Sequence, residues 1–129
     1  MSHFATIQTQ IRDLAALVDA CVELGLKLAP DSTCRGYAGA VRAAPYVIKL
    51  KGPYDIAVEP SADKDGTYNL ATDWWDGHVA KEVGAGFGRL LQSYGVHKTL
   101  REAALRGLRT TRRTEADGTI LLTLEGGSL

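Results

Sequence analysis

The chain has 129 residues and no net charge, which is the size of about one domain. Its hydrophobic and charged fractions, 45% and 23%, are those of an ordinary globular protein, and no run is long and apolar enough to cross a bilayer. The first residues lack a basic cluster followed by an apolar stretch, as a secretory signal would have. We therefore expect one domain over residues 1–129, in the cytoplasm, with no membrane partner.

The first strand and helix follow from local patterns. Residues 2–11 alternate between two sets of side chains, as a strand with one buried face does. Asp13 is a good helix N-cap, and apolar residues then recur at steps of three and four until Gly25. The sequence predicts an amphipathic helix between Asp13 and Gly25.

Short extended segments make up the middle of the chain. The expected segments are residues 26–28, 33–39, 46–51, 54–59 and 67–72. The first should stop at the turn dipeptide Pro30-Asp31, and 33–39 is glycine-broken, which favours a bend or bulge. Gly52-Pro53 and the loop 60–66 should close two hairpins.

The period becomes helical after Gly77 and stays so to about residue 105. Glycines at 84, 86 and 88 disfavour helix, and the sequence leaves open whether they break it, while Gly107 is the expected end. A hairpin about Asp117-Gly118 and a loose tail near 125–129 complete the chain.

The order of these elements, β-α-β-β-β-β-α-β-β, predicts an α+β fold. Consecutive hairpins imply mostly antiparallel pairing, in a sheet of about five to seven strands. Two amphipathic helices suffice to cover one of its faces. We expect a two-layer sandwich.

Residues 68–78 hold most of the candidate chemistry, because they contain both tryptophans and a cluster of polar groups. Asp73, Asp76 and His78 could turn toward one ion, but no pair has a recognised metal-site spacing. Cys21 and Cys34 form no Cys-x-x-Cys pair and are expected as free thiols. We expect no metal and no cofactor.

The adjacent residues Trp74 and Trp75 should point to opposite sides if they lie on a strand. One would then belong to the core and the other would be exposed. Because tryptophan is a common anchor of protein interfaces, this pair predicts a surface for a protein partner.

Several short motifs resemble those of one family. They are Met1-Ser2-His3-Phe4 with Thr6-Ile7 and Thr9-Gln10-Ile11, Arg35-Gly36-Tyr37, Tyr54-Asp55-Ile56, and Asp73-Trp74-Trp75 followed by Leu91-Gln92-x-Tyr94. The chain resembles an uncharacterised family of small proteins, hypothetical open reading frames of cyanobacteria and red-algal plastids, classed as a domain of unknown function in other bacteria. The resemblance covers nearly the whole chain, implies no enzyme activity, and suggests an association with ATPases of the AAA+ class.

Two function hypotheses follow. The first is a non-enzymatic accessory or interaction module for a protein partner, with a homodimer left open. Its candidate binding residues are Trp74, Trp75, Tyr37, Arg35, Tyr94 and His97, and its basic surface is Arg101, Arg106, Arg109, Arg112 and Arg113. No aromatic residue is interleaved with these arginines to stack bases, which argues against nucleic acid. The alternative is an enzyme or small-ligand binder with a pocket near Asp73, Trp74, His78 and His97, although no catalytic motif is recognisable.

Overall fold

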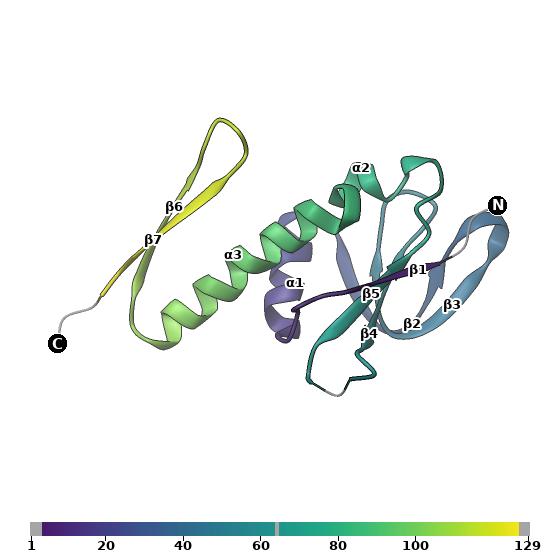
Figure 1. Ribbon diagram of the computed structural model, residues 1–129, viewed down its shortest axis with the longest axis horizontal. Helices are drawn as coiled ribbons and strands as arrows, with labels where there is room; N and C mark the ends of the chain where they lie inside the picture. The colour runs from purple at the N-terminus through teal and green to yellow at the C-terminus, as the bar shows by residue number, and fades with distance from the viewer. Residues whose placement is uncertain (1–3, 64, 127–129) are drawn as a thin grey trace.

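A computed structural model describes residues 4–63 and 65–126 (Figure 1). In chain order the elements are β1 (Ala5–Gln8), α1 (Leu14–Glu23), β2 (Lys27–Arg35), β3 (Val41–Lys49), β4 (Ile56–Pro60), β5 (Tyr68–Thr72), α2 (Ala80–Val83), α3 (Gly88–Leu105), β6 (Arg109–Thr114) and β7 (Ile120–Glu125). The first five strands form one antiparallel sheet in the order β1-β5-β4-β3-β2, and β6 and β7 pair as a separate hairpin. The predicted α+β class, mostly antiparallel with two main helices, is confirmed.

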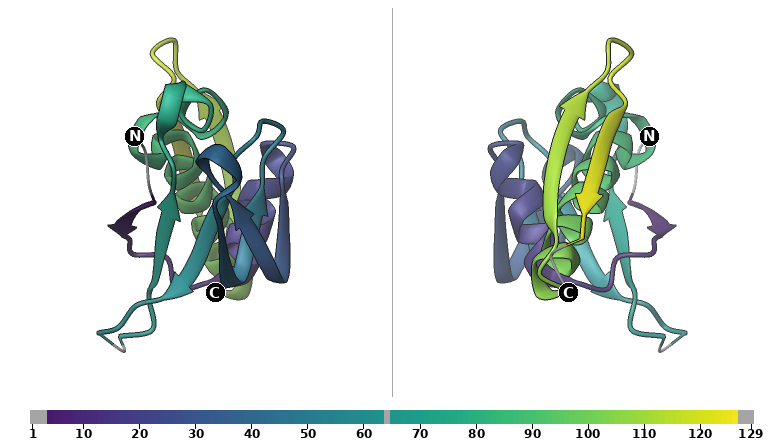
Figure 2. Two further views of the ribbon diagram at one scale, coloured as in Figure 1. Left: turned by 90° about the vertical axis from the view of Figure 1, so that its right-hand side faces the viewer. Right: turned by 90° about the vertical axis from the view of Figure 1, so that its left-hand side faces the viewer.

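The helices α1 and α3 cover one face of the five-stranded sheet (Figure 2). Ile56 and Val58 of β4 point into this layer and are fully buried, together with Leu17 of α1 and Leu90 of α3. Burying each such side chain contributes about 1.5–3 kcal/mol, so the main core lies between sheet and helices.

The long β2–β3 hairpin curls back over the other face of the sheet, as the right-hand side of Figure 1 shows. Ala57 and Ala71 are fully buried on this side, against Cys34 of β2 and Ala44 of β3. These side chains are small, so the curled hairpin can approach the sheet closely. The curl carries the tip of the hairpin, residues 36–40, toward the end of β5.

Strand β1 (Ala5–Gln8) is shorter than the predicted strand 2–11, of which residues 2 and 3 lie outside the described part. After Gln8 the chain leaves the ladder, because the Thr9 hydroxyl donates to the carbonyl oxygen of Tyr68 at 2.6 Å and accepts the Ile11 N–H at 3.0 Å. The Thr9 side chain thus takes part in the connection to β5 beyond the regular ladder, next to a backbone hydrogen bond from the Tyr68 N–H to the Ile11 carbonyl oxygen.

The predicted stop at Pro30-Asp31 is wrong, since β2 runs through both residues to Arg35. β2 is an edge strand, and an edge tolerates proline because one of its sides has no partner. Asp31 adapts by taking a left-handed conformation with φ of 42°.

Several other predicted features hold, but β3 spans Val41–Lys49 and so begins before the predicted segment 46–51. Asp13 caps α1, with its side chain accepting the Ala16 N–H, and Gly25 follows the helix with φ of 73°. The second helical region breaks into α2 and α3 around Gly84, a point that the sequence left open. The C-terminal hairpin is confirmed; Glu125 belongs to β7, and residues 127–129 of the expected tail lie outside the described part. No helix of the described chain has both the length and the hydropathy of a membrane span.

Candidate functional site

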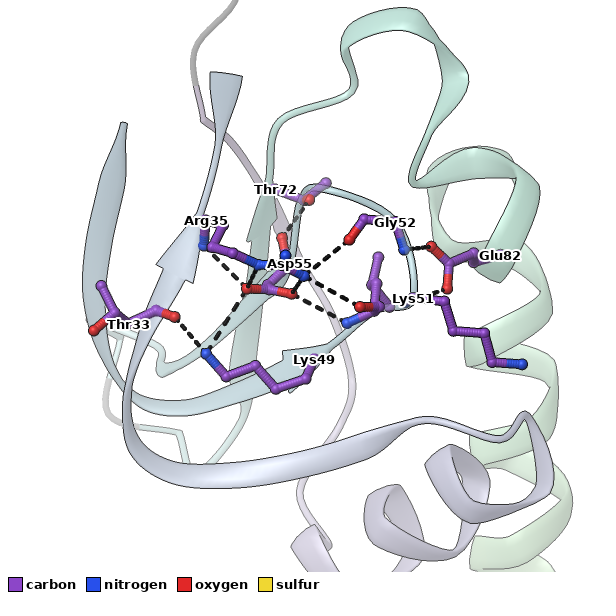
Figure 3. Close-up of polar contacts among 9 residues, drawn as sticks. Thr33, Arg35, Lys49, Lys51, Gly52, Asp55, Thr72 and Glu82 are labelled. Carbon is purple, nitrogen blue, oxygen red and sulfur yellow. Dashed lines mark hydrogen bonds and ion pairs between the residues drawn. The ribbon is translucent and has the colours of Figure 1, made fainter. Parts of the chain in front are cut away.

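The end of β2 is fastened to the start of β4 by Arg35 and Asp55 (Figure 3). The fully buried carboxylate of Asp55 accepts hydrogen bonds from Nε and Nη2 of Arg35, both at 2.8 Å, and from the backbone N–H groups of Arg35 and Leu50, both at 3.1 Å. The carbonyl oxygen of Arg35 accepts the Asp55 N–H at 3.0 Å. Burial alone would raise the pKa of Asp55, but these hydrogen bonds hold the pKa below its ordinary value. The network closes the curl of the hairpin.

A second buried carboxylate, Asp73, joins the hairpin tip to the segment after β5. The tip forms a 3₁₀ turn, Tyr37–Gly39, and the segment after β5 forms another, Trp75–Gly77. Asp73 is 1% exposed and accepts the Tyr37 N–H at 3.2 Å and the Trp75 N–H at 3.0 Å. One side chain therefore fixes the position of both turns.

The aromatic rings of Tyr37 and Trp75 meet at the surface, edge to face, with centroids 5.3 Å apart. Tyr37 is 39% exposed and Trp75 is 44% exposed, so both rings are open to solvent, although Asp73 holds the backbone of both residues. We call these two residues the aromatic corner.

Both turns of the aromatic corner contain a left-handed residue that is not glycine. Ala38 has φ of 54° and Asp76 has φ of 57°. Such conformations cost on the order of 1 kcal/mol or more and persist only where surrounding contacts hold them, as the Asp73 contacts do here. Backbone strain of this kind clusters at functional sites.

Trp74 takes the opposite environment to Trp75. It packs against the core, with its ring 4.6 Å from that of Phe87. The structure thus agrees with the expectation of one inward and one outward tryptophan, although both residues follow β5 and do not lie on a strand.

The polar groups of residues 73–78 make separate contacts. His78 lies 3.7 Å from the Asp76 carboxylate and packs edge to face on Tyr54, whereas Asp73 serves the two turns. Among the described residues, no group of three or more His, Cys, Asp or Glu side chains could hold a metal ion.

Tyr94 and His97, the two other predicted binding residues, lie in the helix layer. The Tyr94 hydroxyl accepts the N–H groups of Arg12 and Asp13 at the start of α1, and His97 Nε2 is 2.8 Å from Glu23. Of the cavities in the described chain, a groove of about 340 Å³ is lined by residues 8–11, Leu91 and Tyr94, and two others lie elsewhere. None of the three is lined by Asp73, Trp74, His78 or His97.

The predicted basic surface is largely an ion-paired seam. Arg112 donates two hydrogen bonds to Glu23 at 2.8 and 2.9 Å, and Arg101 donates one to Asp19 at 2.6 Å. Arg109 pairs with Glu125 and Arg113 with Glu115, while Arg106 is exposed. The hydrogen bonds of Arg112 and His97 lower the pKa of Glu23 to about 2 against the opposing effect of burial. Arg101 and Arg112 therefore connect α3 and β6 to α1.

Sequence reasoning did not assign the part that Asp55 plays. The sequence did contain a signal for this role, because Asp55 directly precedes the apolar residues 56–58. A carboxylate next to a buried strand is buried only when it has hydrogen-bond or charged partners. Sequence analysis considered Asp73 as an ion ligand and did not predict that its carboxylate joins the two turns.

The match to a known family covers residues 20–123, well over half of the chain, and the family is described as "Protein of unknown function (DUF1257)". The chain belongs to this family. The matched range includes the aromatic corner and both buried carboxylates, and it confirms the expected membership in a domain of unknown function. Searches of the curated proteins and of the solved structures give no match for this DUF1257 chain.

Proposed function

We propose that this protein is a non-enzymatic interaction module that binds a protein partner in the cytoplasm through the aromatic corner. The observation that carries the proposal is the double hydrogen bond from Tyr37 and Trp75 to the buried Asp73 carboxylate. It holds two half-exposed aromatic side chains in one fixed arrangement at the surface.

A fixed aromatic pair is well suited to anchor a partner. Tyrosine and tryptophan supply large contact areas with few rotatable bonds, and residues already held in place lose less conformational entropy on binding. Val41, which begins β3 just after the hairpin tip, is 63% exposed and adds apolar area to the same connection. The exposed Asp76 supplies a polar neighbour, as the rim of an interface requires.

The paired arginines support a protein partner over nucleic acid, since their charge is largely taken up by acids of the same chain. The resemblance to cyanobacterial and red-algal plastid reading frames suggests an ATPase of the AAA+ class as the partner, and we include this class in the proposal. The three cavities described above give the enzyme alternative no support, since none of them is lined by Asp73, Trp74, His78 or His97.

The test is quantitative affinity capture from the native host with four forms of the protein. We expect a partner that is enriched with the wild type and lost with Trp75→Ala and Tyr37→Ala. The control is Val22→Ala, which removes an apolar side chain that is 69% exposed on α1, away from the corner, and should retain the partner. A partner that binds all forms equally would contradict the proposal, and circular dichroism would establish that each variant is folded.

A further inference from the structure

The edge strands of the described sheets differ in how they are protected against pairing with another chain. Natural edges are blunted by shortness, charge, proline or bulges. β1 has only four residues, β2 contains Lys27, Pro30 and Asp31, and β6 carries Arg109, Arg112 and Arg113. Each of these three strands has a recognisable protective device.

β7 has none of these devices. Its six residues, Ile120–Glu125, pair one for one with β6 without a bulge, and the single charge is at the last position. Leu121 and Leu124 are 44% and 45% exposed. The right-hand view of Figure 2 shows the hairpin lying outside α3, with β6 and β7 side by side. An unprotected, apolar edge of this length is a surface for strand addition.

We propose that β7 pairs antiparallel with β7 of a second copy of this chain, so that two hairpins join as one four-stranded sheet in the order β6-β7-β7-β6. Charge selects this edge, because β6 brings three arginines and would repel itself, whereas residues 120–124 of β7 are uncharged. Pairing of one strand with its own copy also closes with two-fold symmetry. Pairing of β7 with β6 of a second copy would leave open edges and continue into a filament.

The side-chain pattern selects the register. Ile120, Leu122 and Leu124 share one face of the hairpin, and Leu124 lines a small cavity with Ala103 of α3, so this face is turned to the helix. Placing Leu122 opposite Leu122 of the second copy sets Ile120 opposite Leu124 and keeps this apolar row on one face. The α3 helices of the two copies then lie on the same side of the joined sheet.

The first test uses matched substitutions on the two edges of the hairpin. Thr123 of β7 and Thr111 of β6 are cross-strand partners, and both are exposed. On the same face of the hairpin, Thr111 lies between Arg109 and Arg113, and Thr123 lies between Leu121 and Glu125, the residues opposite these arginines. We expect a Kd of about 10 μM, which leaves most chains paired at a protein concentration of about 100 μM. The wild type should therefore be dimeric by light scattering and sedimentation at that concentration. Thr123→Glu should weaken the dimer at least tenfold, and Thr111→Glu should leave it unchanged. A monomeric wild type, larger assemblies, or a dimer sensitive only to Thr111→Glu would overturn the proposal.

The second test reports the register directly. The native cysteines, Cys21 and Cys34, are 1% and 0% exposed and leave little background for crosslinking. Under mild oxidation, Leu122→Cys should give a covalent dimer and Thr111→Cys should not. Failure of Leu122→Cys to crosslink in a folded protein would overturn this register. The aromatic corner has no part in either test, so the result does not depend on the proposed function.

Discussion

The guanidinium of Arg35 donates two hydrogen bonds of 2.8 Å to the carboxylate of Asp55. The Asp55 side chain is fully buried, while the Arg35 side chain is 47% exposed. This pair lies where the end of β2 meets the start of β4, at the base of the hairpin tip that carries Tyr37. The position of the aromatic corner therefore depends on an ion pair whose carboxylate is fully buried.

Asp55→Asn should lower the free energy of unfolding by about 3 kcal/mol. The substitution leaves the guanidinium of Arg35 without its counter-charge. It also replaces one of the two carboxylate oxygens, each of which accepts a backbone N–H, by an NH₂ donor. Urea unfolding followed by circular dichroism measures the change. The matched control is Glu59→Gln, which removes the charge of a carboxylate that pairs with Arg42 and is 22% exposed, and it should cost less than about 1 kcal/mol. Equal losses for the two variants would show that Asp55 has no special part in closing the hairpin.

Asp73→Asn should loosen the aromatic corner. Asparagine presents an NH₂ group to one of the two backbone N–H donors that Asp73 accepts, and a buried donor left unpaired costs about 1–3 kcal/mol. In a Trp74→Phe background Trp75 is the single tryptophan, and its fluorescence should be quenched more strongly by iodide after Asp73→Asn. Asp76→Asn, at a carboxylate that is 71% exposed, should leave quenching and stability nearly unchanged. Unaltered quenching in Asp73→Asn would remove the support for a braced corner.

The parts of the fold that sequence predicts well are those with local causes. The Asp13 cap, the helical spacing up to Gly25 and the Asp117-Gly118 turn all act through neighbouring residues, and each appears in the structure. Composition and periodicity were sufficient for the α+β class because hairpins and amphipathic helices leave few other arrangements.

The curl of the β2–β3 hairpin has no such local cause. It rests on contacts between distant residues, Arg35 with Asp55 and Tyr37 with Asp73, and on small side chains that admit a close approach. A period-2 pattern reports which face is buried but not what buries it. The exposed tryptophan was therefore foreseeable, whereas its pairing with Tyr37 was not.

The Glu23 cluster should make stability depend on acid. In the folded protein the pKa of Glu23 is lowered from 4.5 to about 2, first by Arg112 and then by His97. A lowered pKa means that the ionised carboxylate stabilises the fold above pH 4.5 and that this stabilisation is lost as pH falls toward 2. Because the Glu23 side chain is about one-third exposed, we discount the effect to about 1 kcal/mol.

Glu23→Gln should therefore be less stable than the wild type by about that amount at pH 7 and equally stable near pH 2, as measured by urea unfolding across pH. Glu115→Gln, which removes a pair within the outer hairpin, provides the comparison. A wild-type advantage that stays constant down to pH 2 would contradict the ionic origin of the effect.

Two glycines of the second helical region should respond to alanine in opposite directions. Gly84 has φ of +84°, and a Cβ there would lie 2.7 Å from the backbone nitrogen of Arg89, so Gly84→Ala should destabilise the protein by more than about 1 kcal/mol. Gly95 lies within α3 with nothing within 4 Å of an added Cβ, and Gly95→Ala should stabilise the protein by about 0.5–1 kcal/mol. Urea unfolding of the two variants decides the matter. Because poor helix propensity alone would make both substitutions stabilising, opposite signs would show that the break between α2 and α3 is required by packing around Gly84.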